Sequence, residues 1–101
     1  MDAGPGSVPG RLQRSEDPMP LFMDIHHVEG GVTAADVAGA HEKDLATQGE
    51  FGVNYLKYWV DEDAGKIFCL VDAPDAEAAT AVHAKAHGLV ADEIYPISAE
   101  G

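Results

Sequence analysis

The sequence predicts a single α+β domain in which two helices cover one face of an antiparallel β-sheet. Four segments either alternate in polarity or are rich in β-branched and aromatic residues, as strands are. Two further segments space their apolar residues as an amphipathic helix does, and glycines or acidic turns separate the segments. A chain of 101 residues is long enough for one such domain with a modest core.

The first half of the domain is expected to supply a strand and a helix. Residues 20–28 alternate in polarity and are followed by two glycines, which predicts a strand that ends there. Thr33 is a favourable N-cap for a helix over residues 34–48, which Gly49 ends. The inward stripe expected for this helix consists of Ala34, Val37, Ala38, His41 and Leu45.

The second half is expected to supply a hairpin, a helix and a last strand. Residues 53–61 and 66–72 are joined by an acidic turn with one glycine, which predicts a β-hairpin. A second helix follows the cap residue Asp75 and ends at His87, before a glycine, and residues 90–98 form the last strand. The resulting order, βαββαβ, is the split-βαβ or ferredoxin-like arrangement.

The stretch before this domain has a different composition. Residues 1–18 contain three glycines and three prolines and almost nothing to bury, so we expect a disordered leader. Residues 19–101 then form the folded domain.

A sheet covered by helices on one face leaves its other face open. Such a surface is expected to be covered by a second copy of the chain, which predicts a homodimer. The apolar side chains expected on this open face are Phe22, Leu56, Tyr58, Phe68 and Leu70.

The charge and the cysteine content exclude several classes of partner. With 18 acidic and 6 basic residues, the formal net charge is −12, which disfavours nucleic acid and membrane surfaces and attracts cations. No apolar run approaches the roughly 20 residues of a membrane helix. The single Cys69 cannot form an internal disulfide and is expected to be a small buried hydrophobe, which fits a cytoplasmic protein.

Four of the five histidines are expected to meet at one end of the molecule. His83 and His87 lie four residues apart, and therefore on one face of the second helix. In the predicted topology the first strand runs parallel to that helix, which brings His26 and His27 to the same end. His27 shares a strand face with Leu21, Met23 and Ile25 and is therefore expected to point toward the helices, while His26 points outward with Asp24.

This convergence predicts a metal site. The expected ligands are His26, His27, His83, His87, Glu29 and Glu93. His27, His83 and His87 would supply imidazole nitrogens, His26 would belong to a second or shared position, and either glutamate would add a carboxylate. Imidazole with carboxylate and no thiolate suits nickel, zinc or copper. Binding should weaken below roughly pH 6, where ordinary histidines become protonated.

Other interpretations of these residues remain open. A helical histidine pair is often only a solvated face, and His41 on an apolar stripe is typical of a satisfied core residue. No nucleophile, phosphate-loop or metalloprotease motif is present, so we expect no catalytic activity. The alternative is a dimeric small-molecule-binding protein or a cofactor-free isomerase or monooxygenase, with a pocket near His41 lined by Tyr55 and Trp59. A protein interaction module without a ligand is a third possibility.

Several stretches carry a resemblance to a known family. They are Asp24-Ile-His-His, Val53-Asn-Tyr-Leu-Lys-Tyr-Trp-Val-Asp, Phe68-Cys-Leu-Val-Asp-Ala-Pro and Val82-His-Ala-Lys-Ala-His-Gly-Leu-Val-Ala-Asp-Glu-Ile. From about Met19 to Gly101 the chain resembles the small actinobacterial nickel-binding proteins of ferredoxin-like fold. The resemblance implies a homodimer that binds nickel on its surface, with a role in nickel sequestration or detoxification and no catalytic step.

Overall fold

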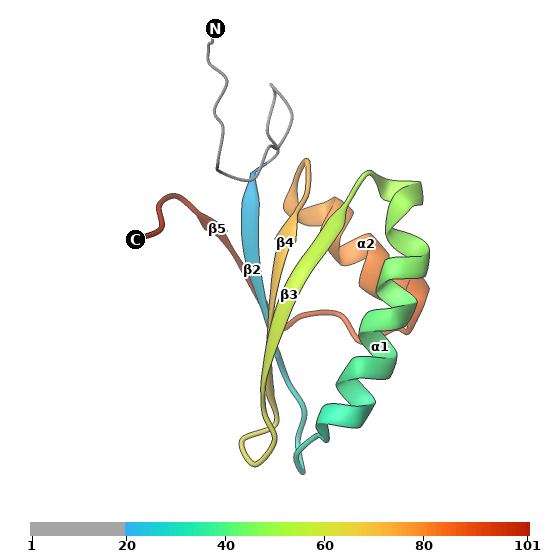
Figure 1. Ribbon diagram of the computed structural model, residues 1–101, viewed down its shortest axis with the longest axis vertical. Coiled ribbons are helices and arrows are strands. Elements are labelled where there is room, and N and C mark those ends of the chain that lie inside the picture. The colour runs from blue at the N-terminus through green and yellow to red at the C-terminus, as the bar shows by residue number, and fades with distance from the viewer. Residues whose placement is uncertain (1–19) are drawn as a thin grey trace, which may run out of the picture.

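The structure, a computed structural model, describes residues 20–101 and forms two layers, a four-stranded sheet and two α-helices on one of its faces (Figure 1). The elements are β2 (Leu21–His27), α1 (Ala34–Thr47), the 3-10 helix η1 (Gln48–Phe51), β3 (Asn54–Asp61), β4 (Lys66–Asp72), α2 (Ala76–Ala86) and β5 (Glu93–Ile97). The strands are antiparallel in the order β3-β4-β2-β5, so the predicted ferredoxin-like fold is confirmed. The expected disordered leader lies outside the described residues.

The helices begin where their cap residues predict. The Thr33 hydroxyl accepts a hydrogen bond from the Asp36 amide at 3.1 Å, and the Asp75 carboxylate accepts one from the Ala78 amide at 2.8 Å. The last strand is shorter than predicted, because it begins at Glu93 instead of residue 90. None of the helices described is long and apolar enough to cross a membrane.

The two faces of β2 are the reverse of those expected. Phe22, Asp24 and His26 are buried under the helices, whereas His27 is exposed on the other face. The prediction took the more apolar set of alternating residues as the core set. It was wrong because the apolar set, Leu21, Met23 and Ile25, lies on the open face of the sheet, and because the buried Asp24 and His26 bond each other.

The inward stripe of α1 also differs from the prediction. Val37 is buried as expected, but Ala34, Ala38 and Leu45 are exposed. The buried polar residue on this helix is Asp44, which is only 3 % exposed. Val37, His41 and Asp44 follow the i, i+4, i+7 spacing of one helical face. The buried face of α1 therefore includes the Asp44 carboxylate, which forms hydrogen bonds with histidines of α2 and its C-cap.

A β-bulge decides which aromatic residues of β3 point toward the helices. The pairing with β4 shifts between Tyr55 and Lys57, so Leu56 is the extra residue. Tyr55 and Tyr58 therefore both point toward the helices although they are three residues apart, and the Tyr58 ring packs 4.8 Å from that of His41. Trp59 consequently lies on the open face and is 44 % exposed.

The open face of the sheet is apolar, as expected, although its composition differs. Phe68 and Leu70 lie on it, whereas Phe22 is in the core and Tyr58 faces α1. The other large apolar or aromatic side chains on this face are Leu21, Met23, Ile25, Trp59, Tyr95 and Ile97.

Candidate metal centre

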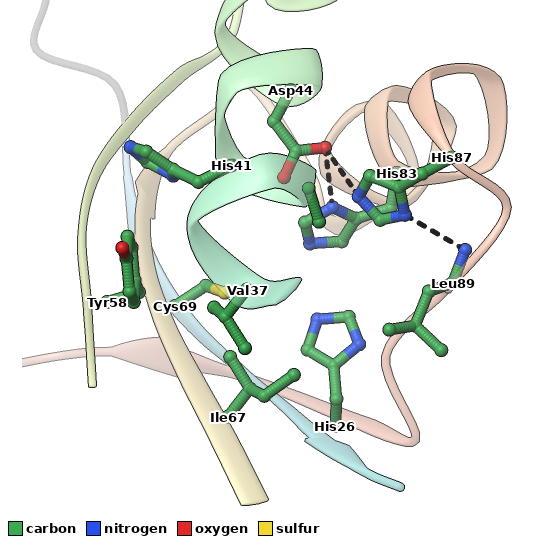
Figure 2. Close-up of a pocket in the computed structure, with 11 residues that line it drawn as sticks. His26, Val37, His41, Asp44, Tyr58, Ile67, Cys69, His83, His87 and Leu89 are labelled. Carbon is green, nitrogen blue, oxygen red and sulfur yellow. Dashed lines mark hydrogen bonds and ion pairs between the residues drawn. The ribbon is translucent and has the colours of Figure 1, made fainter. Parts of the chain in front are cut away.

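A cluster of ionisable side chains lies between the sheet and the C-terminal half of α2 (Figure 2). Five elements contribute to it: β2, β3, β4, α1 and α2. Its hydrogen-bonded members are Asp24, His26, Asp44, Tyr55, His83 and His87. Such a concentration of polar groups inside a small core is unusual unless they are mutually satisfied or bind a ligand.

His83 is at the centre of this cluster. Its Nδ1 lies 2.9 Å from Asp44 Oδ1 and its Nε2 lies 3.0 Å from Asp24 Oδ2, and the residue is 1 % exposed. Burial alone would lower the pKa of His83, but the hydrogen bonds and charges of the two carboxylates raise it to about 9. At neutral pH the ring is therefore an imidazolium that donates both of its N–H groups.

Asp24 is bonded from three directions. Besides His83, it accepts hydrogen bonds from His26 Nε2 at 3.2 Å and from the Tyr55 hydroxyl at 2.8 Å. Burial alone would raise the pKa of Asp24, yet the bonds from the two histidines, the charge of His83 and the Tyr55 bond hold it well below its usual range. Burial and the Asp24 charge raise the pKa of Tyr55, so the phenol keeps its proton.

His87 has a defined tautomer. The Leu89 backbone N–H donates to His87 Nδ1 at 3.1 Å, so this nitrogen must be the acceptor. Burial lowers the pKa of His87 more than the nearby Asp44 charge raises it, which favours the neutral ring. The ring proton is therefore on Nε2, which donates to Asp44 Oδ1 at 2.9 Å.

Cys69 completes the cluster from the neighbouring strand. It pairs directly with Asp24 across the β2–β4 ladder and is buried. Burial first, and then the Asp24 carboxylate, raise the pKa of this thiol, so it stays protonated without a metal ion. The sequence predicted its burial but not its position beside three ionisable groups.

Two sets of these residues have the composition and spacing of metal ligands. Asp44, His83 and His87 form what we call the outer group, and Asp24, His26, Cys69 and His83 form the inner group. Within each group, one ligand atom per residue lies within 4.8 Å of all the others. Adjacent ligand atoms of an octahedral ion with bonds of about 2.1 Å are about 3.0 Å apart. This is close to the nitrogen–oxygen distances of the hydrogen bonds in the outer group.

The histidines line a small cavity beside α1. Its volume is about 20 Å³, enough for one water molecule or one ion. Pockets for organic ligands are usually about 300–1,000 Å³, so the alternative of an organic-ligand site near His41 finds little support here. Trp59, which that alternative placed in the pocket, lies on the opposite face of the sheet.

The structure brings together only some of the ligands that the sequence predicted. His26, His83 and His87 converge, with His26 and His83 ring centroids 4.8 Å apart. His27 points away on the open face, and Glu29 and Glu93 are exposed and belong to neither group.

Sequence reasoning missed the two carboxylates. Asp24 lies two residues before His26 and therefore on the same face of β2, and Asp44 lies seven residues after Val37 on the buried face of α1. An acidic residue at a core position of a strand or helix was the signal that could have identified them. The view that the helical histidines are a solvated pair is wrong for His83, which is buried.

Comparison with known proteins agrees with the fold. No curated protein matches the sequence. Among solved structures, SCO4226 from Streptomyces coelicolor A3(2) is similar, with a TM-score of 0.76 and 37% identity over 80% of this chain and 99% of that chain. The family of nickel responsive proteins described as SCO4226-like matches residues 22–97. The chain therefore belongs to the SCO4226-like family of nickel responsive proteins.

Proposed function

We propose that this protein binds Ni²⁺ through the outer group. The observation that carries the proposal is the convergence of one carboxylate oxygen and two imidazole nitrogens, from Asp44, His83 and His87, beside a cavity of about 20 Å³. Imidazole and carboxylate together suit Ni²⁺, and three protein donors leave positions for water. The description of the family as nickel responsive supports this choice of ion.

The proposed role is sequestration or detoxification of nickel in the cytoplasm, without catalysis. The buried thiol and phenol in the cluster both keep their protons, so neither is an activated nucleophile. A net charge of −12 raises the local concentration of cations around the chain.

Calorimetric titration of the metal-stripped protein with Ni²⁺ tests the site. We expect saturable binding that weakens by at least about tenfold in Asp44→Asn and in His87→Gln. Mutating a residue that only hydrogen-bonds to a metal ligand typically lowers metal affinity about 10- to 100-fold, and removing a ligand itself should lower it at least as much. His27→Gln is the matched control, since that ring is exposed on the opposite face and should leave the affinity unchanged. In nickel-stressed cells, overproduced wild-type protein should protect growth and the two ligand variants should not.

The opposite pattern would overturn the outer group as the site. If His27→Gln abolishes binding while His87→Gln does not, nickel binds on the open face. Thermal unfolding of each metal-free variant separates lost ligation from lost structure.

Nickel affinity should rise with pH over an unusually high range. The ion takes the place of the proton on His83 Nδ1, and that ring stays protonated up to a pKa of about 9. The nickel-bound state holds fewer protons, so raising the pH favours it, by up to about tenfold per unit between about pH 6.5 and 9. Titrations at about pH 6.5, 7.5 and 8.5 measure the slope. An affinity that is constant above about pH 7 would contradict the imidazolium at His83.

Binding at His87 must also disturb the segment that follows α2. If the ion binds Nδ1, it takes the lone pair that now accepts the Leu89 N–H. If it binds Nε2, the ring proton moves to Nδ1 and faces the same N–H group. In both cases Leu89 loses its acceptor, so nickel occupancy is coupled to the conformation of residues 88–92.

Amide hydrogen exchange measures this coupling. We expect exchange at the Leu89 amide to become faster when Ni²⁺ binds, although a bound ligand usually slows exchange. The Ala78 amide, which is capped by Asp75 at the other end of α2, is the internal control. Unchanged or increased protection at Leu89 would show that His87 keeps its present hydrogen bond and is not a ligand.

We also propose that two copies of the chain pack through their open sheet faces. This face is apolar across all four strands and includes Trp59 and Tyr95, which are 44 % and 51 % exposed. A second copy presents the same surface, so a two-fold, sheet-on-sheet contact is self-complementary.

Sedimentation equilibrium tests the dimer. Phe68→Glu should weaken association by at least about 30-fold, because it places a charge at the centre of the apolar face. Leu45→Glu, an equally drastic change at an exposed apolar residue on α1, should leave the dimer intact. A wild-type chain that sediments as a monomer would refute the proposal.

A further inference from the structure

We propose that the inner group, formed by Asp24, His26, Cys69 and His83, is a second metal position, which binds a zinc-type ion through a thiolate. It is distinct from the proposed nickel site in three of its four ligands. The two groups share the His83 ring but use different nitrogens, Nδ1 toward Asp44 and Nε2 toward Asp24.

The sheet register places these ligands side by side. Asp24 and Cys69 are direct partners across the β2–β4 ladder, so their side chains project from the same face of neighbouring strands. His26 lies two residues further along β2 on that face, and His83 comes down from α2 onto it. All four residues are buried, and their potential ligand atoms lie within 4.8 Å of one another.

The cluster carries an excess of negative charge. Asp24 and Asp44 bring two formal negative charges into the core, and the His83 imidazolium compensates only one. Within residues 20–101 no lysine pairs with either carboxylate, and Lys85 pairs with Glu50 at the surface. A divalent ion at the inner group replaces two protons, one from Cys69 and one from His83, so the cluster accepts it with no change in its net charge.

The position of His26 is not explained by hydrogen bonding. Its Nε2 is 3.2 Å from Asp24 Oδ1, but its buried Nδ1 has no hydrogen-bond partner. Leaving such a buried nitrogen without a hydrogen bond costs about 1–3 kcal/mol of folding free energy, so hydrogen bonding alone does not account for the burial of this ring. Coordination of an ion through Nε2 would give the ring a role, and His26 also lines the cavity of about 20 Å³, which has room for one water molecule.

The donor set selects the class of ion. Thiolate, imidazole and carboxylate are all ligands of zinc, and four protein ligands together make a closed tetrahedral site. With bonds of about 2.0–2.3 Å, tetrahedral ligand atoms lie about 3.3–3.8 Å apart, so the group must contract by about 1 Å. Because four protein ligands leave no open position, this ion would be structural, and its binding releases the Cys69 thiol proton and one His83 proton.

Titration of the metal-stripped chain with Co²⁺, a spectroscopic substitute for Zn²⁺, tests the proposal. We expect an intense visible spectrum of tetrahedral type and a near-ultraviolet thiolate-to-cobalt band, both displaced by Zn²⁺. Cys69→Ser should abolish the charge-transfer band, and His26→Gln should weaken Co²⁺ binding by at least about tenfold. Asp44→Asn and His87→Gln, which belong to the outer group alone, should retain the band.

The outcomes separate this position from the proposed nickel site. If Cys69→Ser keeps its nickel affinity but loses the cobalt band, both proposals stand. A cobalt complex of the wild-type chain without a charge-transfer band, or a band that survives in Cys69→Ser, overturns the inner position and leaves the outer one unaffected. Should Cys69→Ser fail to fold, zinc X-ray absorption of the wild-type chain decides, since the proposal requires one sulfur at about 2.3 Å.

Discussion

The His83 imidazolium between two buried carboxylates is the interaction on which this structure depends. It joins β2 to α2 through Asp24, and α1 to α2 through Asp44. Both layers of the fold therefore meet at one ring. Removing one member of such a buried set leaves a charge without compensation, which typically costs about 3–5 kcal/mol. The core of this small domain is consequently held by polar bonds as well as by apolar contact.

The same ring bears on how a metal ion would enter the proposed sites. In many small metal-binding domains the ligands repel one another until the ion arrives, so folding requires metal. Here protons occupy the places between the ligand atoms, at nitrogen–oxygen separations from 2.9 to 3.2 Å. A metal ion bound as proposed would exchange with those protons and leave the ligand residues close to their present positions.

The sequence predicted the fold well because each element carries local signals that need no tertiary information. Thr33 and Asp75 cap helices, and residues 53–61 and 66–72 form a hairpin as expected. Topology also predicted that β2 and α2 bring histidines to the same end of the molecule, but it assigned His27 to the helix side, where the structure has His26. The carboxylates were missed because hydropathy assigns acids to the surface, and only a partner distant in the sequence, here His83, makes their burial favourable.

The error over His26 and His27 shows what fixes the composition of the buried cluster. Neighbours on a strand point to opposite faces, so a shift of one residue in β2 would exchange the two rings and expose Asp24. Strands β4 and β5 pair with β2 on its two sides and hold that register, with Asp24 opposite both Cys69 and Ile94. The selection of His26 over His27 is thus made by the hydrogen bonds of the sheet. Because a metal ion could coordinate either imidazole, the fold, and not the affinity of the ion for histidine, determines which groups form the centre.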